Sequence, residues 1–313
     1  MSIPVGISAC VLGEKVRFDG GHKRNRFVTD ELTKFFEFKP VCPEMAIGMG
    51  TPRPAIRLVE RDDDIRLVST KDIDDDFTAA MKAFAEKKLP SLSQLCGYVV
   101  CAKSPTCGME RVKLYIENGN TIPGGTVGLY TQALMQMYPW LPVEEDGRLQ
   151  DPILRENFVL RVFALNDLYT STADLSAKAI IDFHSRYKLM LMAHSQQAYR
   201  NLGRLVASIA KYELEEFFVE YRLQFMQALQ LRANKKNNTC VLQHIQGYFK
   251  KYLSKEQKAE LARVIMDYRV GDLPLLGVLT LVNHYLNTYP DEYLLSQVYL
   301  HPYPQELKLR YGL

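Results

Sequence analysis

The stretch that decides the fold is IPVGISAC, at residues 3–10. Its first five residues are apolar and rich in β-branched side chains, which predicts a buried strand over Ile3–Ser8, and a cysteine follows shortly after it. A β-type run followed by a cysteine occurs twice more. Lys39–Val41 is followed by Cys42, and Gly97–Cys101 is followed by Cys107. A strand that ends in a cysteine-bearing loop is therefore a recurring unit of the first half of the chain.

Helical patterns lie between these strands. Thr29–Phe36 is one such segment, and Asp72–Lys88 is another, with Phe77, Met81 and Phe84 on one face. The sequence also predicts a hairpin from Ala55–Val59 and Ile65–Ser69, and a helix that Gly124-Gly125-Thr126-Val127-Gly128 opens and that runs to about Tyr138. This alternation predicts an α/β, Rossmann-like domain with a mostly parallel sheet.

The pattern changes after about residue 140. Pro139-Trp140-Leu141-Pro142 ends the preceding helix, and 143–152 is acidic and irregular, which indicates a linker. Beyond it, apolar residues recur at spacings of three and four, which predicts amphipathic helices. The expected helices cover 152–170, 173–192, 195–210, 211–233, 238–252, 255–270 and 276–288. We therefore predict an α/β domain at 1–142, a linker at 143–152 and an all-α domain at 153–313.

The composition is that of a globular protein, with 47% hydrophobic and 24% charged residues among 313. Leu273–Leu286 is the most apolar late segment, but it is too short to span a bilayer and contains Pro274, Gly277 and His284. The N-terminal residues do not have the pattern of a secretory signal. We therefore expect a cytoplasmic protein without a membrane partner, in which the six cysteines are thiols rather than disulfides.

Cys10, Cys42 and Cys107 are candidate metal ligands. Loops at the carboxyl ends of parallel strands converge on one crevice, so three thiols far apart in the sequence can meet there. Three converging thiolates suit an iron–sulfur cluster that keeps one iron without a protein ligand. The alternative is that all three are buried and inert, because free cysteine is among the most buried residue types. The remaining cysteines, Cys96, Cys101 and Cys240, are expected to serve packing.

Polar residues in the same loops are candidate catalytic groups. Glu44 follows Cys42 by two positions, Lys103 and Ser104 precede Cys107, and Asp19 precedes a Gly-Gly turn. Simpler roles are a turn residue for Asp19, a cap for Ser104 and a solvated cation for Lys103. Gly124 and Gly125 precede a helix, where they either present backbone N–H groups to an anion or form a tight turn.

Several of these motifs together resemble the thiouracil desulfidase family. They are Ser8-Ala9-Cys10 with Gly13 and Asp19-Gly20, Cys42-Pro43-Glu44, Pro52-Arg53 and Lys103-Ser104-Pro105-Thr106-Cys107-Gly108. The second half resembles the helical domain that is fused to it in a longer, YbgA-like form. The matching stretches include Phe183-His184-Ser185-Arg186-Tyr187-Lys188, Leu191-Met192-Ala193-His194-Ser195 and Leu202-Gly203-Arg204-Leu205-Val206-Ala207. The resemblance covers essentially the whole chain.

The resemblance implies a [4Fe–4S] cluster on Cys10, Cys42 and Cys107 and the removal of sulfur from thiolated uracil. Glu44 and Ser104 match its catalytic positions. For the fused form it implies 4-thiouridine in tRNA as substrate, with RNA bound by the helical domain. The residues expected to contact the substrate or RNA are Ser8, Arg53, Gly124, Gly125, Arg186, Lys188, His194, Arg200 and Arg204.

Conversion of a thiocarbonyl to a carbonyl is a hydrolysis, so it requires no net electron transfer. We expect the open iron to act as a Lewis acid and Glu44 to act as the general base, with Asp19 as the second candidate. Ser104 is expected to donate a hydrogen bond, and Lys103 to offset negative charge or to meet a phosphate.

Charge alone is weak support for RNA binding by the second half. From Asp151 onward the chain has 20 Lys and Arg against 16 Asp and Glu. A solvated helix face with structural histidines explains the same residues without RNA. Two other functions also stay open. One is a desulfidase of free thiouracil or thiolated nucleotides, whose helical domain serves oligomerisation or acts as a lid. The other is a non-catalytic iron–sulfur sensor. The sequence leaves the oligomeric state open.

Overall fold

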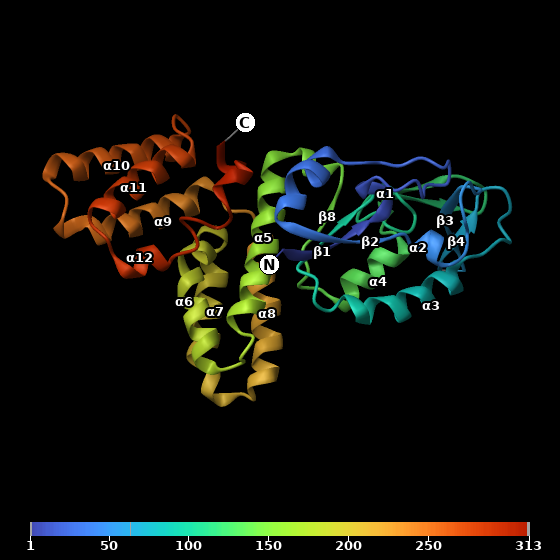
Figure 1. The fold of residues 1–313 in the computed structure, drawn as a ribbon, viewed down its shortest axis with the longest axis horizontal. Helices are drawn as coiled ribbons and strands as arrows, with labels where there is room; N and C mark the ends of the chain where they lie inside the picture. The colour runs from blue at the N-terminus through green and yellow to red at the C-terminus, as the bar shows by residue number, and fades with distance from the viewer. Residues whose placement is uncertain (1, 63, 312–313) are drawn as a thin grey trace. The chain divides into compact units, whose positions relative to one another are not determined.

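The computed structural model describes residues 2–62 and 64–311, and it divides the chain into two compact units, Met1–Phe158 and Val159–Leu313. Figure 1 shows the elements of both units with their labels. The first unit contains two β-sheets, and the second is helical. The predicted fold class, an α/β domain followed by an all-α domain, is confirmed.

The first sheet positions the cysteine loops. Its strands are β1 (Ile3–Ser8), β2 (Phe36–Val41), β5 (Gly97–Val100) and β8 (Val143–Glu145), in the order β2-β1-β5-β8. Every neighbouring pair is parallel. β5 is buried along its whole length and β1 almost so, which is typical of parallel strands covered on both faces. Since all the strands run the same way, their carboxyl ends lie along one edge.

The second sheet has the order β4-β3-β6-β7. Its strands are β3 (Ile56–Arg61), β4 (Asp64–Ser69), β6 (Val112–Ile116) and β7 (Thr121–Thr126). β3 and β4 form the predicted antiparallel hairpin, β6 pairs with β3 in parallel, and β7 pairs with β6 in antiparallel fashion. β6 and β7 were not expected from the sequence.

Short helices connect the strands of this unit. They are α1 (Ala9–Leu12), a π-helical turn at Phe27–Glu31, a 3₁₀ turn at Leu32–Lys34, α2 (Pro43–Ala46), α3 (Thr78–Lys88), a 3₁₀ turn at Leu89–Leu92 and α4 (Leu129–Met137). Helices α3 and α4 pack against each other (Figure 1). The helix predicted at 72–88 therefore starts only at Thr78.

The segment expected to be a linker, 143–152, is an ordered part of the first unit. It contains β8 and a 3₁₀ turn at Arg148–Gln150, and Leu149 is fully buried. The two compact units divide at Phe158, inside α5 (Pro152–Ser171), rather than in a loop.

The second unit follows the predicted helices closely. Its further helices are α6 (Ala177–His194), α7 (Gln196–Ala207), α8 (Leu214–Gln230), α9 (Lys235–Tyr248), α10 (Lys255–Val270), α11 (Leu275–Thr288) and α12 (Glu292–Ser296). Shorter 3₁₀ turns lie at Ile209–Lys211, Phe249–Lys251, Gln305–Leu307 and Leu309–Tyr311. Side-chain caps set several helix starts, because Ser176, Ser195, Asn234 and Ser254 each accept a hydrogen bond from the first turn.

The core of the second unit contains a cluster of aromatic rings from α6 and α8. Phe183, Tyr187, Tyr221 and Phe225 are all buried and pack in stacked or edge-to-face pairs. Among the residues described, none of the helices is both long and apolar enough to cross a membrane.

Candidate functional site

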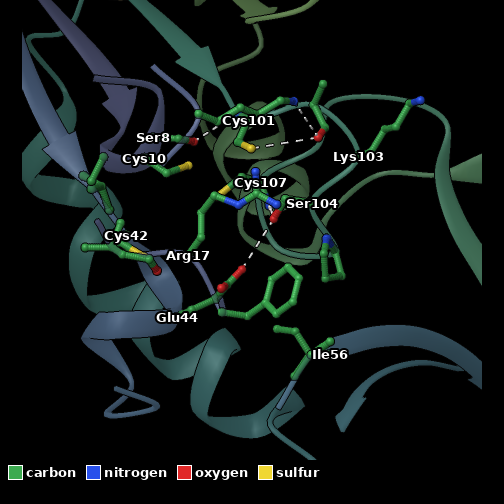
Figure 2. A pocket seen from close by; sticks show the side chains of 18 of the residues that line it. Ser8, Cys10, Arg17, Cys42, Glu44, Ile56, Cys101, Lys103, Ser104 and Cys107 are labelled. Atoms are coloured by element: carbon green, nitrogen blue, oxygen red, sulfur yellow. Dashed lines mark hydrogen bonds between the residues drawn. The ribbon is translucent and has the colours of Figure 1, made fainter. Parts of the chain in front are cut away.

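The ends of three parallel strands bring the predicted cysteines together. Cys10 lies in α1 directly after β1, Cys42 immediately follows β2, and Cys107 lies in the loop after β5. All three line one cavity of about 330 Å³, which Figure 2 shows from close by. The cavity is also lined by Ser8, Val16, Arg17, Phe18, Lys23, Val41, Glu44, Arg53, Ile56, Cys101, Lys103, Ser104 and Pro105.

The surroundings of the cysteines favour their neutral form. A hydrogen bond with the Cys101 thiol, together with burial and the other cysteines, raises the pKa of Cys10 above its ordinary value. Burial raises the pKa of Cys42, and it raises the pKa of Cys107 to about 12. A positive metal centre reverses this balance, since a coordinating thiol loses its proton. Metal binding by these thiols would therefore release protons.

The donor set is of the type that iron–sulfur clusters use. Among the described residues, no group of three or more His, Cys, Asp or Glu side chains is arranged to hold one metal ion. Cys10, Cys42 and Cys107 follow three different strands and line a shared cavity. Soft thiolates around a space of this kind are the ligands that iron–sulfur clusters use.

Glu44 lies in the same cavity and is held by several neighbours. It forms an ion pair with Arg53, whose side chain is only 2% exposed. Its other oxygen accepts hydrogen bonds from Thr106 Oγ1 at 2.7 Å and from Ser104 Oγ at 3.5 Å. The dashed line in Figure 2 joins Glu44 to Ser104. The carboxylate is therefore fixed at the wall of the cavity, beside the loop that carries Cys107.

Ser104 connects Glu44 to that loop. Its Oγ accepts hydrogen bonds from the backbone N–H groups of Cys107 at 3.1 Å and of Thr106 at 3.3 Å. Thr106 is fully buried, and its hydroxyl lies 3.5 Å from Cys107 Sγ. The Thr106 hydroxyl thus touches both the candidate base and a candidate ligand, a role that the sequence prediction missed.

The Arg53 guanidinium binds groups of the protein itself, and its contact with a substrate stays a prediction. Its guanidinium donates to the carbonyl oxygens of Gly50 at 2.6 Å and Val16 at 3.0 Å, in addition to the Glu44 ion pair. The residue is 8% exposed. Ser8, also expected to contact the substrate, is buried at the end of β1, where its Oγ accepts the backbone N–H of Cys101 at 3.1 Å.

Asp19, the second candidate base, does not line the cavity. Its Oδ1 accepts the backbone N–H of Gly21 at 3.0 Å and lies 3.7 Å from Arg17 Nε, and the side chain is about half exposed. It is the turn residue of the simpler interpretation.

Gly124 and Gly125 also lie outside the cavity. They belong to β7, and α4 begins only at Leu129. The first N–H groups of α4 are already used, because Leu129 and Tyr130 donate to the carbonyls of Pro105 and Thr106. The start of α4 therefore supports the Cys107 loop, and contact of Gly124 and Gly125 with a substrate stays a prediction.

The helical unit contains a second cavity, of about 860 Å³. Three of the predicted RNA contacts, Lys188, Arg200 and Arg204, line it together with Tyr199 and Gln197. His184 lines it too; its Nδ1 is 3.2 Å from the Tyr221 hydroxyl, and its buried Nε2 has no hydrogen-bond partner. We call this cavity with its cations the basic groove.

The other two residues predicted to contact RNA, Arg186 and His194, bind groups of the helical unit. Arg186 donates to Asp167 Oδ1 at 2.9 Å and to Ser171 Oγ at 2.8 Å. His194 is 5% exposed, and its Nδ1 faces the carbonyl oxygen of Leu231 at 2.5 Å. Both sets of contacts lie within the helical unit, and contact of these two residues with RNA stays a prediction.

Each half of the chain matches a known protein-family model. A family model described as 2-thiouracil desulfurase matches residues 5–146, and one described as a protein of unknown function, DUF1722, matches residues 188–304. The uncharacterized protein YbgA of Escherichia coli (strain K12) is 38% identical over 159 residues, which is 50% of this chain and 94% of YbgA. The chain belongs to the thiouracil desulfidase-like, YbgA-type proteins.

A solved structure of a [4Fe-4S]-dependent thiouracil desulfidase, TudS, is 26% identical and has a TM-score of 0.39, covering 51% of this chain and 99% of that one. The match to the desulfurase family spans the strands and loops that form the cysteine cavity of this YbgA-type chain.

Proposed function

We propose that this chain is a [4Fe–4S]-dependent desulfidase that converts 4-thiouridine in tRNA to uridine and releases hydrosulfide. The observation that carries the proposal is the shared cavity, in which Cys10, Cys42 and Cys107 lie together with Glu44 and Ser104. The match of residues 5–146 to the 2-thiouracil desulfurase family supports the reaction class.

Cys10, Cys42 and Cys107 would hold the cluster. When bound through three thiolates, it supplies one iron without a protein ligand, a Lewis acid for the soft sulfur of a thiocarbonyl. Lys23 and Lys103 line the same cavity and offset part of the negative charge there.

Glu44 acts as the general base on the attacking water. Arg53 and Thr106 hold its two oxygens from opposite sides, so the carboxylate keeps one orientation while it takes the proton. Ser104 has its Oγ fixed by backbone N–H groups and donates its hydroxyl proton toward Glu44, which adds to the fixed orientation of the base. Water supplies the oxygen of the product and the proton that accompanies the released sulfur, so the reaction balances without an oxidant.

An apolar wall of the cavity suits a pyrimidine ring. This wall consists of Phe18, Ile56 and Pro105, and Phe18 is 43% exposed. Aromatic faces bind nucleobases by stacking. The Arg17 guanidinium lies 5.7 Å from the centre of the Phe18 ring and adds a cation at this side.

The basic groove is the proposed contact with the RNA backbone. Lys188, Arg200 and Arg204 line it, and Arg200 and Arg204 are exposed. Cations that gather along one groove are typical of phosphate binding, whose strength falls as salt rises.

The test is anaerobic. The full chain is reconstituted with iron and sulfide and mixed with tRNA that contains 4-thiouridine, and the loss of the thiouridine absorbance is followed together with hydrosulfide. Turnover on tRNA with release of hydrosulfide is the expected result, and a chain without iron should show none. If the chain binds the cluster but releases no hydrosulfide, the alternative of a non-catalytic iron–sulfur sensor is favoured instead.

Free thiouracil is the second candidate substrate, because the matching family is described by that compound. The same assay with free 4-thiouracil and 2-thiouracil decides between them. Turnover of the free bases with no turnover of tRNA would reject the RNA proposal and keep the desulfidase.

A further inference from the structure

A buried histidine of the basic groove has an unused ring nitrogen. His184 is 2% exposed and lines the groove, whose walls come from α6 and α7, two helices that pack against each other (Figure 1). Its Nδ1 lies 3.2 Å from the Tyr221 hydroxyl of the aromatic core, whereas its Nε2 has no hydrogen-bond partner among the described residues. A buried polar atom without a partner is rare in native proteins and requires an explanation.

The contact with Tyr221 decides which ring nitrogen of His184 carries the proton. Tyr221 is fully buried, and among the described residues its hydroxyl bonds only to His184 Nδ1. If Nδ1 donated to this hydroxyl, the hydroxyl proton would have no acceptor. The hydroxyl therefore donates to Nδ1, and the proton of the neutral ring lies on Nε2. Burial, with the charge of Lys188 adding to it, lowers the pKa of His184 to about 4, so the ring is neutral near pH 7.

The side chains beside His184 in the groove favour an anion. Lys188 lies one turn later on the same face of α6, and Arg200 lines the groove from α7. In the described part of the chain, neither cation forms an ion pair, and no Asp or Glu lines the groove. Arg204, by contrast, donates to Asn201 Oδ1 at 2.7 Å. Two cations and one neutral N–H donor suit a phosphate group, whose oxygens carry negative charge and accept hydrogen bonds.

Gly203 leaves room for a ligand beside these groups. It lies in α7 between Arg200 and Arg204 and lines the groove. A Cβ atom at this position would meet no neighbouring atom of the described residues within 4 Å. The groove is therefore open at Gly203, and a larger side chain there fills it without changing its charge.

We propose that the basic groove holds one phosphate group, with His184 Nε2–H donating to a phosphate oxygen and with Lys188 and Arg200 beside it. This inference rests on the proposed function where the phosphate belongs to the backbone of tRNA. A free phosphate ion offers the same chemistry, so both sources are tested. His184 differs from the two cations because it is buried and neutral, and it binds an acceptor at one fixed position.

The experiment measures binding rather than turnover. The full chain is titrated onto a labelled tRNA transcript without 4-thiouridine and followed by fluorescence anisotropy at several salt concentrations. His184→Asn keeps an oxygen that accepts from Tyr221 but has no atom at the position of Nε2, whereas His184→Gln restores an N–H group there. We expect His184→Asn to bind tRNA about tenfold or more weakly, because a hydrogen bond to a charged group is lost. His184→Gln should bind close to the wild type.

The salt dependence separates the neutral donor from the cations. A neutral N–H group releases no counterion, so the logarithm of the affinity should fall with the logarithm of the salt concentration at the same slope in His184→Asn and in the wild type. Lys188→Gln should reduce the magnitude of that slope by about one, because it removes one cation from the phosphate.

A second variant blocks the groove without changing its charge or the aromatic core. Gly203→Leu places a side chain in the open space and should weaken tRNA binding at least as much as His184→Asn. Gly247→Leu is the matched control, since Gly247 lies in α9, outside the groove, and a Cβ there also meets no neighbouring described atom within 4 Å. It should bind tRNA as the wild type. Circular dichroism establishes that every variant keeps its helices.

Inorganic phosphate tests the other source. The chain is prepared with ¹⁵N-labelled histidine, and the ring signals of His184 are identified by their absence from His184→Asn. A shift of these signals on addition of inorganic phosphate to the wild type, but not to Gly203→Leu, shows that the site takes free phosphate. If tRNA does not bind in the same conditions, RNA binding by the groove is contradicted while the phosphate site stands.

Two results overturn the phosphate site when inorganic phosphate leaves the His184 signals unmoved. One is wild-type affinity for tRNA in His184→Asn or in Gly203→Leu, which shows that the bound RNA does not use the groove at His184. The other is an equal loss of affinity in His184→Asn and His184→Gln, which shows that the ring acts through the fold rather than through Nε2.

Discussion

At the scale of single residues, Glu44 is distinguished from every other candidate base by its contacts. Arg53 pairs with one of its oxygens, and the Thr106 and Ser104 hydroxyls approach the other. Asp19 has an exposed side chain in a turn, outside the cavity. The two carboxylates that sequence reasoning could not separate therefore have different surroundings, and only Glu44 lies within reach of a substrate in the cavity.

Glu44→Gln should lower turnover by about a hundredfold or more, since the amide keeps the size of the side chain but accepts no proton. The measurement is the rate of thiocarbonyl loss, with iron content determined on the same sample to show that the cluster is retained. Asp19→Asn is the control and should behave as the wild type. If Asp19→Asn abolishes turnover while Glu44→Gln retains it, the assignment of the base is reversed.

At the scale of elements, the sequence predicts the units whose pattern is local. The apolar runs of β1 and β5 and the spaced apolar residues of α6 and α7 show their structure directly. The position of Cys10, Cys42 and Cys107 shortly after strands follows from the same local pattern. The order of the strands in the sheet does not, because β2-β1-β5-β8 depends on which strands meet, and no strand encodes that alone.

Strands β7 and β8 were missed for a different reason. β7 contains Pro123, Gly124 and Gly125, which usually mark turns. β8 contains Glu144 and Glu145, which look solvated in the sequence. Both acids are buried and satisfied by tertiary partners: Glu144 Oε1 accepts from Arg148 at 2.6 Å, and Glu145 Oε1 accepts from the Met109 N–H at 2.9 Å. Such partners cannot be recognised from composition.

Two buried histidines of α6, His184 and His194, predict that the stability of the fold depends on pH. Burial lowers the pKa of both His184 and His194 to about 4, with Lys188 adding to the effect at His184 and Arg310 and Arg161 at His194. In the unfolded chain each imidazole takes up a proton near pH 6.5, whereas the folded chain excludes it until about pH 4. The free energy of unfolding should therefore fall as the pH drops through this window, by at most about 1.4 kcal/mol per pH unit for each histidine.

Urea unfolding followed by helical circular dichroism at pH 7.5, 6.0 and 5.0 measures this slope. His184→Asn removes one of the two groups and should reduce the slope, because asparagine does not titrate. An unchanged slope in this variant would show that His184 is not excluded from protonation in the fold.

At the scale of the whole molecule, the cysteine cavity is proposed to carry out the reaction and the basic groove to bind RNA. Charge-reversal variants of the full chain test whether these two roles are separate. Lys188→Glu with Arg204→Glu places two acids in the basic groove, so kcat/KM for thiolated tRNA should fall at least about tenfold, and its dependence on salt should weaken with each lost phosphate contact. Turnover of free thiouracil should stay at the wild-type rate, because both substitutions leave the cysteine cavity unchanged.

The matched control is Lys211→Glu with Lys255→Glu. It changes the net charge equally at exposed positions outside the groove and should keep tRNA turnover. If the two double variants lose tRNA turnover equally, general charge rather than the groove attracts the RNA; if neither loses it, the helical unit does not bind the substrate through these cations.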